Sequence, residues 1–389
     1  MIVNKNETVV SRRRICFIVS IFNIADAFLR DHIEALSEHF DVYLVANFKE
    51  DDMIRVGMLK LSGYKSIHIE RNINVVKDSI AVIELYRYFK KMEFYSVHSV
   101  SPKAGLVTSL AGFMAGIPNR IHIFTGQVWA TKTGLLRYAL MSIDRLISTL
   151  NTKIMVDGES QRLYLIEHKI IKIQNSILIG EGSIAGVNTK RFTPTKSVRD
   201  NIRKELNIND TQVVYIFLGR LNKDKGIDEL LQAFNKLAEE DKNVYLLLIG
   251  VDEDNYISRL PEFSNIQNGI NFHYFGKTTT PEETLQAGDI FCLPTYREGF
   301  GTSVIESSCL GLPVICSDTY GVIDAMVDDI TGLRCKVKDV DSLYQQMKRL
   351  SNDPVLRKKL GLNGRERVLD KFSGKLITQQ WVELYKNLN

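Results

Sequence analysis

Short apolar runs alternate with amphipathic segments along most of the chain. Residues 15–19 are apolar at every position, which is the pattern of a strand buried on both faces of a parallel sheet. After Asp26, the residues Phe28, Ile33 and Leu36 recur at helical spacing and predict an amphipathic helix that begins at Asp26. Because this alternation continues along the chain, the sequence predicts an α/β fold with doubly wound parallel sheets and ligands at the carboxyl ends of the strands.

The other predicted elements follow the same alternation. Further strands are predicted at residues 42–46, 65–69, 95–98, 120–124, 153–156, 213–218, 245–249 and 290–293. Further helices are predicted at residues 51–62, 76–92, 102–116, 135–150, 197–206, 339–350, 353–370 and 374–387. The helix at 102–116 has Pro102 in its first turn and Gly116 at its end, as helix boundaries favour.

Length and charge narrow the possibilities. A chain of 389 residues is expected to form two domains, and residues 190–200, which include Pro194, have the composition of a linker between them. The net charge of +4 suits anionic small ligands or a membrane surface but is too small to indicate nucleic-acid binding.

Neither a membrane span nor a signal peptide is expected. No apolar run reaches the roughly 18 residues of a span, and the arginines at 12–14 precede a short strand rather than a long apolar region. The five cysteines form no C-x-x-C pair and lie in apolar segments, so reduced core thiols in a cytosolic protein are expected. They are Cys16, Cys292, Cys309, Cys316 and Cys335.

The stretch 289–317 has the pattern strand, loop, helix, strand, with glycines in the loop. Ser303 and Glu306 have the spacing of a capping box, which predicts that a helix begins there. Glu298 lies in the preceding loop. Two interpretations are open: Glu306 only caps the helix and Glu298 is a solvated charge, or the two carboxylates flank a phosphate site and bind hydroxyl groups on either side of it.

A second loop carries cations between two glycines. Gly219 follows a predicted strand, Gly226 precedes a predicted helix, and Arg220 and Lys225 lie between them. An arginine can bind phosphate oxygens with two hydrogen bonds, and a lysine adds a point charge. This placement favours a diphosphate site over a solvated loop.

These segments resemble a known enzyme family. Glu298-Gly299-Phe300-Gly301, with Glu306 eight positions after Glu298 and then the pattern C-x-G-x-P-V-I, resembles the EX7E signature of retaining glycosyltransferases of the GT-B type, and is similar to family 4 of these enzymes. The segments 219–226 and 180–188 resemble further motifs of that family, although Asn188 replaces its usual aspartate. Segment 98–105 resembles the branch that assembles surface polysaccharides, such as O-antigen and capsule.

The resemblance assigns roles to individual residues. The catalytic set it implies is Glu298, Arg220 and Lys225, with Glu298 on sugar hydroxyls. The donor-binding set is Gly219, Gly250, Lys277, Thr278, Gly299, Phe300, Gly301, Thr302 and Glu306, with Glu306 on the ribose. The residues near the acceptor or the reacting sugar are Asn23, His98, Lys103, Thr125, Gln127 and Trp129.

Three positions depart from the family pattern or leave alternatives open. The first loop, 20–25, has no glycine, and Thr125 stands where many relatives have a histidine. His98, at a strand end, is as compatible with a structural hydrogen bond as with a functional role. Trp129 is as compatible with plain packing as with contact to a sugar or to lipid.

The resemblance implies two Rossmann-like domains that face each other across a cleft. The acceptor domain is expected at 1–190, the nucleotide-sugar domain at 191–372, and a final helix at 373–389 that crosses back to the first domain. The implied reaction is retaining transfer from a nucleotide-diphosphate sugar, in relatives usually a UDP-sugar, to a lipid-linked saccharide such as an undecaprenyl-diphosphate sugar. We expect a cytoplasmic enzyme held peripherally at the inner face of the plasma membrane by basic residues that include Lys132, Arg137 and Arg145.

No cofactor or metal ion is expected. Asp252 and Asp254 form a D-x-D pattern that binds metal in another transferase class, but a cationic diphosphate site would compete with it. Two alternatives remain: a nucleotide-sugar epimerase on the same fold, and a non-catalytic nucleotide-binding partner of an assembly complex. An NAD-dependent oxidoreductase is disfavoured, because no G-x-G-x-x-G follows the strand at 15–19.

Overall fold

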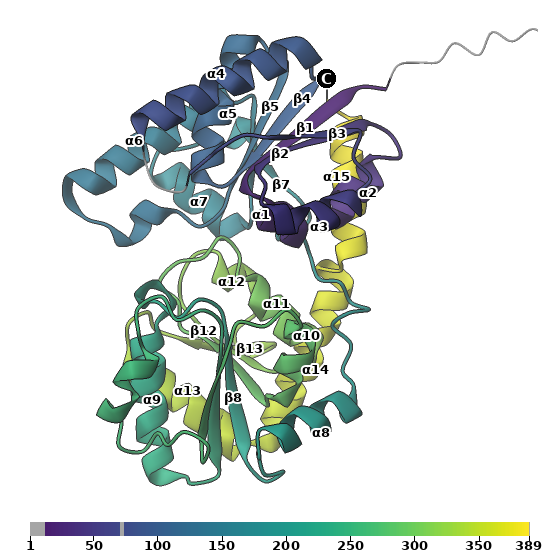
Figure 1. Cartoon of the computed structure of the whole chain (residues 1–389). Coiled ribbons are helices and arrows are strands. Elements are labelled where there is room, and N and C mark those ends of the chain that lie inside the picture. Colours follow the sequence, from purple (N-terminus) through teal and green to yellow (C-terminus); the bar gives the residue numbers. More distant parts are fainter. Residues whose placement is uncertain (1–11, 71–73, 389) are drawn as a thin grey trace, which may run out of the picture.

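The computed structural model describes residues 12–70 and 74–388 and consists of two α/β domains, drawn one above the other in Figure 1. Within these residues the first domain holds a seven-stranded sheet of order β3-β2-β1-β4-β5-β6-β7, and the second a six-stranded sheet of order β10-β9-β8-β11-β12-β13. The strand pairings β1·β2, β1·β4, β8·β9 and β8·β11 at the centres of the sheets are parallel. The predicted doubly wound α/β class is confirmed.

The N-terminal domain alternates strands and helices as expected. Its strands are β1 Arg14–Ile21, β2 Asp41–Asn47, β3 Gly63–Ser66, β4 Ser96–Val100, β5 Asn119–Phe124, β6 Lys153–Val156 and β7 Ser176–Leu178. Its helices are α1 Phe22–Phe28, α2 Arg30–Leu36, α3 Met53–Gly57, α4 Val75–Met92, α5 Pro102–Ala115, α6 Gly134–Leu150 and α7 Glu159–Glu167.

The C-terminal domain repeats the arrangement. Its strands are β8 Val213–Leu218, β9 Val244–Ile249, β10 Phe272–Gly276, β11 Ile290–Leu293, β12 Val314–Ser317 and β13 Gly332–Cys335. The helices after the linker are α8 Lys196–Glu205, α9 Ile227–Glu240, α10 Pro281–Thr284, α11 Thr302–Cys309, α12 Val322–Ala325, α13 Val340–Asn352, α14 Pro354–Lys371 and α15 Gly374–Lys386.

The apolar run of β1 is explained by its two buried faces. Phe17 packs into a core shared with α1, α2 and α15, whereas Cys16 and Ile18 pack into a second core with α4 and α5. Alternate residues of a strand point to opposite faces of the sheet. Each residue of the run is therefore withdrawn from water, which is the physical basis of the pattern in the sequence. The five cysteines are buried and free, as expected.

Two predicted helix boundaries are wrong. The first helix begins at Phe22 rather than Asp26, and the helix predicted at 51–62 is reduced to α3 and a short 3₁₀ turn before it. Asp26 lies inside α1, and its carboxylate pairs with Arg30 and, at 2.8 Å, with Arg55 of α3. A charge pair between two elements cannot be recognised from helical periodicity.

Two chain segments cross side by side between the domains. Val187 and Ser373 form a parallel bridge, and the backbone N–H groups of Val187 and Gly374 donate to Phe372 and Val187 at 2.8 and 2.7 Å. Beyond this crossing, α15 runs along the upper domain (yellow in Figure 1) and buries Trp381 completely in its core. The final helix therefore stabilises the first domain. No helix in the described part of the chain has the length and hydropathy of a membrane span.

Candidate active site

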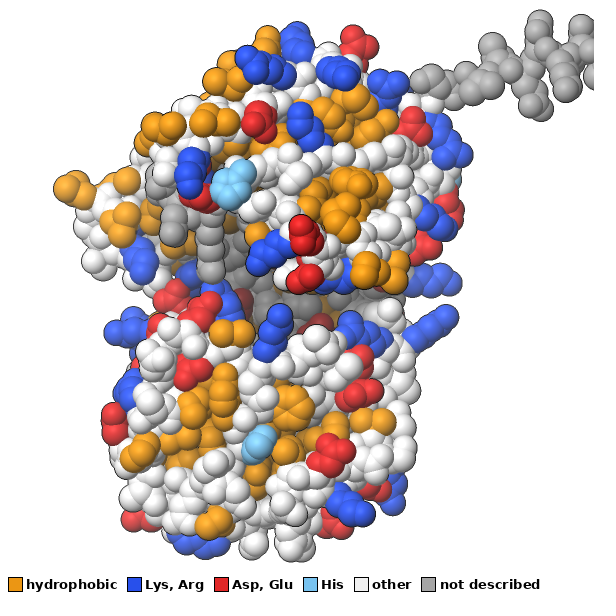
Figure 2. Space-filling model, in the orientation of Figure 1, with side chains coloured by type: hydrophobic (Ala, Val, Ile, Leu, Met, Phe, Trp, Pro, Cys, Tyr) orange, Lys and Arg blue, Asp and Glu red, His pale blue; other side chains and the backbone are white. Residues whose placement is uncertain are grey.

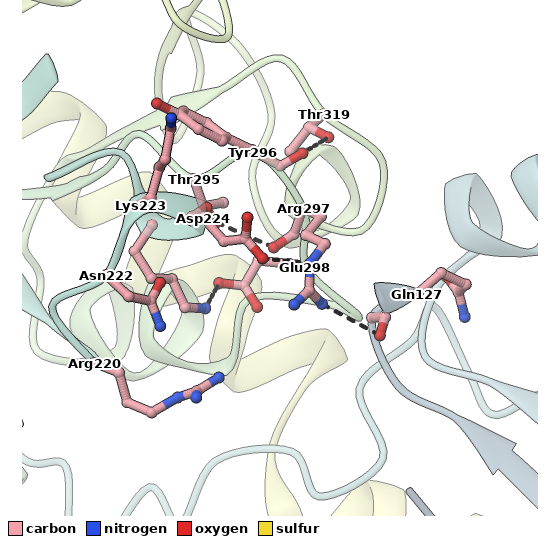
Figure 3. A network of polar contacts seen from close by, with 12 residues as sticks. Gln127, Arg220, Asn222, Lys223, Asp224, Thr295, Tyr296, Arg297, Glu298 and Thr319 are labelled. Atoms are coloured by element: carbon pink, nitrogen blue, oxygen red, sulfur yellow. Dashed lines mark hydrogen bonds and ion pairs between the residues drawn. The ribbon is translucent and has the colours of Figure 1, made fainter. Parts of the chain in front are cut away.

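Two loops at the carboxyl ends of adjacent strands are tied together at Asp224. The strands β8 and β11 are neighbours in the sheet, so the loops that follow them leave it side by side. The carbonyl oxygen of Asp224 accepts hydrogen bonds from the Tyr296 backbone N–H at 2.8 Å and the Thr295 hydroxyl at 2.9 Å. The carboxylate of Asp224 accepts a further bond from Nε of Arg297 at 2.9 Å. This network, drawn in Figure 3, fixes the loop that carries Glu298.

Lys225 and Glu298 form an ion pair at the junction of these loops. Nζ of Lys225 donates to Oε1 of Glu298, and the two side chains are only 18% and 17% exposed. The sequence predicted both residues as functional from two separate motifs, and the fold brings them into contact. A cation and a carboxylate thus meet where the fold class places ligands, at the carboxyl ends of the strands.

Arg220 belongs to the same loop but is held at a different point. Its Nη1 lies 3.1 and 3.0 Å from the two carboxylate oxygens of Glu253, and the side chain is 44% exposed. Asn222 also donates to Glu253, at 2.7 Å. Arg220 therefore lies outside the Lys225–Glu298 pair, and Figure 3 draws it apart from the dashed network.

The two aspartates of the D-x-D pattern are used to shape the backbone. Asp252 accepts hydrogen bonds from the backbone N–H groups of Tyr256 and Ile257, both at 2.9 Å. Asp254 accepts one from the Lys223 backbone at 2.8 Å. Among the described residues, no group of three or more His, Cys, Asp or Glu side chains is arranged to hold a metal ion.

Backbone hydrogen bonds align the remaining loops of the second domain. The N–H of Gly219 donates to Ile249 at 2.9 Å, and the N–H of Gly250 donates to Gly276 at 2.8 Å. Thr278 is partly buried, and its hydroxyl accepts a bond from the Thr280 backbone at 3.0 Å, whereas Lys277 is exposed. The loops after β8, β9 and β10 therefore form one continuous edge.

The start of α11 differs from the prediction. The helix begins at Thr302, and its N-cap is Gly301 with φ of +88° and no side-chain hydrogen bond, so the Ser303–Glu306 capping box is wrong. Glycine adopts this left-handed conformation without a steric penalty, so the backbone alone sets the helix start. Phe300 is 3% exposed and packs against Phe372, with 5.2 Å between the ring centroids. Phe300 thus offers a ligand its backbone rather than its ring.

Glu306 is partly buried inside α11. Burial raises the pKa of its carboxyl to about 7, the positive charge of Arg191 opposes this, and the charge of Glu282 adds to it. A raised pKa together with a specific charge partner is typical of a functional position. Glu306 is therefore free of the capping role and still fits a ligand contact.

The two domains touch at the loop that carries Glu298. A Cβ on Gly126, which follows β5, would lie 3.0 Å from the carbonyl carbon of Glu298. Nη1 of Arg297 donates to the Gly126 carbonyl at 3.5 Å. Farther along the interface, the Ser160 hydroxyl donates to Asp324 at 2.6 Å. Figure 2 shows Lys and Arg side chains on both sides of the waist between the domains.

Trp129 is a packing residue. Its side chain is 1% exposed, and its indole N–H donates to Asp144 at 2.7 Å. It stacks on Tyr164, with ring centroids 5.2 Å apart, and Tyr164 stacks in turn on Tyr320 of the second domain at 4.1 Å. Of the alternatives left open by the sequence, the structure supports packing rather than contact with sugar or lipid.

The other acceptor-side candidates separate into two groups. Thr125 and Gln127 flank Gly126, which approaches the Glu298 backbone, and the Gln127 side chain donates to the Thr125 carbonyl at 2.8 Å. His98 is completely buried instead, with Nδ1 2.7 Å from the Tyr385 hydroxyl and its ring stacked on Trp381. Lys103 pairs with Asp78, and Asn23 accepts a hydrogen bond from Arg55 at 3.0 Å. The structure thus gives His98 a structural hydrogen bond, which was one of its two interpretations.

Sequence reasoning missed four residues of this region. They are Asp157, Arg297, Tyr320 and Asp324, which all face the boundary between the domains. Asp157 directly follows β6, and Arg297 directly precedes Glu298, so a search of all polar residues at strand carboxyl ends would have found these two. Tyr320 and Asp324 lie in a loop and a short helix with no distinctive pattern.

Comparison with known proteins gives consistent matches over most of the chain. Residues 198–367 match the family described as "Glycosyl transferases group 1". The chain is 30% identical to the capsular polysaccharide biosynthesis glycosyltransferase CapM of Staphylococcus aureus, over 92% of this chain and 93% of that protein. It is 28% identical to the N,N'-diacetylbacillosaminyl-diphospho-undecaprenol alpha-1,3-N-acetylgalactosaminyltransferase of Campylobacter jejuni, over 77% and 79% of the two chains.

A solved structure shows the same fold. The crystal structure of Anabaena Alr3699/HepE in complex with UDP superimposes with a TM-score of 0.79, at 15% identity, over 96% of this chain and all of that one.

Proposed function

This chain belongs to the group 1 glycosyltransferases of the GT-B fold that act in surface-polysaccharide synthesis, and we propose that it transfers a hexosyl or N-acetylhexosaminyl residue from a UDP-sugar to a lipid-linked saccharide, with retention of configuration. Support for the acceptor comes from the Campylobacter relative, whose name specifies a diphospho-undecaprenol sugar. Support for the donor nucleotide comes from the structural neighbour, which was crystallised with UDP.

The observation that carries the proposal is the contact between Lys225 and Glu298 at the carboxyl ends of the strands of the second sheet. A nucleotide-sugar presents an anionic diphosphate next to a neutral, hydroxyl-rich ring. Lys225 supplies positive charge for the diphosphate, and Glu298 supplies acceptor oxygens for sugar hydroxyls. In this arrangement the anomeric carbon of the donor lies where the two side chains meet.

The start of α11 completes the donor site in this proposal. The backbone N–H groups of its first turn and the dipole of the helix favour an anion, and Gly301 adds no side chain in front of the diphosphate. Glu306, in the second turn, binds the ribose hydroxyls. Because hydroxyl donors favour the ionised carboxylate, donor binding lowers the pKa of Glu306 from its raised value.

The proposed reaction needs no covalent intermediate. The bond between the anomeric carbon and the β-phosphate oxygen breaks while Lys225 and the α11 amides stabilise the charge that develops on the leaving diphosphate. The acceptor hydroxyl then forms its bond on the same face, and its proton passes to the leaving phosphate oxygen. Retention follows because attack and departure use one face of the sugar.

The same arrangement requires no metal ion in this proposal. Lys225 and backbone N–H groups provide the positive charge, while Asp252 and Asp254 are occupied by backbone donors. The diphosphate is thus neutralised by the protein itself.

The exposed apolar residues at the beginning of α6 are consistent with a lipid-linked acceptor, because they can contact a membrane. Leu135, Leu136 and Tyr138 are 89%, 56% and 65% exposed at the beginning of this helix, and Lys132 beside them is exposed. Figure 2 shows hydrophobic side chains at this tip of the upper domain, where Figure 1 labels α6. We place the tip in the interfacial region of an anionic membrane, with the chain bound peripherally at the cytoplasmic face.

The basic residues expected to provide this attachment are used differently. Arg137 lies over the Trp129 ring at 5.4 Å and contacts His168, and Arg145 donates to the His168 carbonyl at 3.2 Å. Their charges are directed to the protein, so apolar insertion carries more of the proposed binding than the sequence suggested.

The experiment that tests the proposed function is a screen of donors with a defined acceptor. The purified chain is incubated with UDP-glucose, UDP-galactose and their N-acetylated forms, with and without a polyprenyl-diphosphate N-acetylhexosamine, and the products are read by mass spectrometry. The proposal predicts an acceptor extended by one sugar together with free UDP. Isomerised UDP-sugar without acceptor would indicate an epimerase, and absence of turnover with every donor would indicate a binding protein.

A further inference from the structure

Asp157 is a buried carboxyl that the proposed reaction has not used. It follows β6 in the first domain and is 5% exposed. Its backbone is held on both sides, because its N–H donates to the Gln161 side chain at 2.7 Å and its carbonyl accepts from the Ser183 N–H at 2.7 Å. The position of its backbone is therefore fixed by the fold.

One oxygen of this carboxyl is unsatisfied. Oδ1 of Asp157 is buried and has no hydrogen-bond partner within residues 12–70 and 74–388. Burying a polar atom without a partner is costly, and such atoms are rare in native proteins. This oxygen can therefore accept a hydrogen bond from a ligand hydroxyl.

The carboxyl faces the loop that carries Glu298. A Cβ on Gly299 would lie 2.4 Å from Oδ2 of Asp157 and 3.0 Å from the backbone nitrogen of Gly126, so only a glycine allows the three segments to meet. Burial raises the pKa of Asp157 to about 7, a backbone hydrogen bond from Ile184 opposes this, and the charge of Glu298 adds to it. The electrostatic influence of Glu298 agrees with the contact geometry.

Two carboxyl groups on opposite domains restrict what can bind between them. A phosphate would be repelled by Glu298 and Asp157 together, whereas a neutral polyol donates its hydroxyls to carboxyl oxygens. Lys225, which forms an ion pair with Glu298, suits the anionic part of the ligand. The chemistry separates a sugar subsite from a phosphate subsite.

We propose that Asp157 binds a hydroxyl group of the transferred sugar through Oδ1, so that the sugar is held between carboxyls of both domains. This inference rests on the proposed function and deepens it, because it assigns the first domain a part in selecting the donor sugar. A hydroxyl whose orientation or presence differs between sugars then decides which donor is accepted.

The first test compares UDP with intact UDP-sugars as ligands. Isothermal titration calorimetry is run with UDP, UDP-glucose, UDP-galactose and the N-acetylated forms on the unaltered protein and on the variants Asp157→Asn and Asp157→Ala. We expect unchanged affinity for UDP and a loss of about 10- to 100-fold in affinity for the UDP-sugar, the size of one hydrogen bond to a charged group. Asp144→Asn is the matched control, because Asp144 is also buried and also has a pKa raised to about 7, but it pairs with Trp129.

The second test removes the hydroxyl instead of the carboxyl. Deoxy analogues of the preferred UDP-sugar are compared on the unaltered protein and on Asp157→Ala. One analogue should lose activity with the unaltered protein and lose none in addition with the variant, since both changes remove the same contact.

Four outcomes would overturn the inference. Losses that add independently for every deoxy donor, or equal loss of affinity for UDP and for UDP-sugar together with a lower melting temperature, would make Asp157 a structural residue only. Full activity of Asp157→Asn and Asp157→Ala would show that Oδ1 meets only water. If the unaltered protein binds no UDP-sugar more tightly than UDP and turns none over, the proposed function itself fails, and the inference fails with it.

Discussion

Lys225 and Glu298 neutralise each other in a partly buried pair, and this affects how variants of either residue are interpreted. Removing one partner of such a pair leaves the other charge poorly compensated, which costs stability as well as function. Activity and melting temperature must therefore be measured on the same variants.

Removing a cation near the donor diphosphate should slow the reaction. Lys225→Ala should reduce turnover about 100- to 1,000-fold, since loss of one charged donor to a developing oxyanion costs about 3–4 kcal/mol. Lys223→Ala is the control, because this lysine lies in the same turn but extends toward Tyr296 in Figure 3. Steady-state turnover at saturating donor is the measurement, and near-normal turnover of Lys225→Ala would place the diphosphate elsewhere.

Activity should survive the removal of divalent metal ions. The carboxylates of Asp252 and Asp254 already accept backbone hydrogen bonds, so a metal would have to displace them. Turnover is compared before and after excess EDTA, with Mg²⁺ or Mn²⁺ then restored. Complete loss that either metal reverses would return the D-x-D aspartates to the reaction.

The buried carboxyl of Asp144 should make stability depend on pH. Burial raises its pKa to about 7, and the Trp129 hydrogen bond only partly opposes this. An unfolded aspartate titrates near pH 4. Between about pH 4 and pH 7, Asp144 therefore keeps its proton in the folded chain but has lost it in the unfolded chain. Its contribution to stability is present below about pH 4 and is lost as the pH rises to about 7.

The test is a comparison of melting temperatures at pH 5 and pH 8 for the unaltered protein and Asp144→Asn. The variant should gain stability relative to the unaltered protein as the pH rises. The upper limit of this gain is about 1.4 kcal/mol for each unit by which folding raises the pKa of Asp144. An unchanged difference between the two pH values would show that Asp144 has an ordinary pKa.

At the scale of elements, the position of helix α11 was predicted correctly, but the residues expected to start the helix were not the ones that do. Its position was predicted from Ser303 and Glu306, whereas the helix is started by the left-handed backbone of Gly301. The consequence is functional: Glu306 is released from capping, so a change at this residue should affect ligand binding more than the helix.

The exposed beginning of α6 should bind lipid. In flotation with vesicles that contain phosphatidylglycerol, Leu135→Asp should bind about tenfold or more weakly than the unaltered protein, since inserting a leucine contributes about 1.5–3 kcal/mol. Val355→Asp is the matched control, because Val355 is 77% exposed on α14 of the other domain. Part of the binding should persist at high salt. Equal flotation of both variants, or no flotation of the unaltered protein at low salt, would contradict membrane binding by α6.

At the scale of the whole molecule, the loops of the two domains are in contact around Glu298. Tyr320 of one domain stacks on Tyr164 of the other, and Asp324 accepts hydrogen bonds from the Ser160 backbone N–H and hydroxyl. These contacts hold residues of both domains at one site, so the activity depends on how the domains are joined.

Much of the fold and part of the candidate site are predictable from the sequence. The remainder is not predictable, and the reason is physical. Alternating patterns predicted the class of fold and most elements, because strands such as β1 are buried on both faces. Local motifs also predicted Lys225 and Glu298. Contacts between the domains, such as those of Asp157 and Tyr320, depend on the relative placement of two sheets, which no local pattern contains.

The most direct test of the proposed site is a pair of measurements on Glu298→Gln: the melting temperature, and turnover at saturating UDP-sugar. Glutamine still accepts a hydrogen bond from Lys225, so the melting temperature should stay within a few degrees of the unaltered value, about what a loss of 1 kcal/mol or so produces. Turnover should fall about 100-fold, because the sugar is misplaced relative to the bond that breaks. Glu240→Gln, which removes an exposed carboxylate paired with Lys348 at 2.6 Å, should change neither value. Full activity of Glu298→Gln, or a loss of activity that only follows unfolding, would contradict the assignment of this loop as the sugar-binding site.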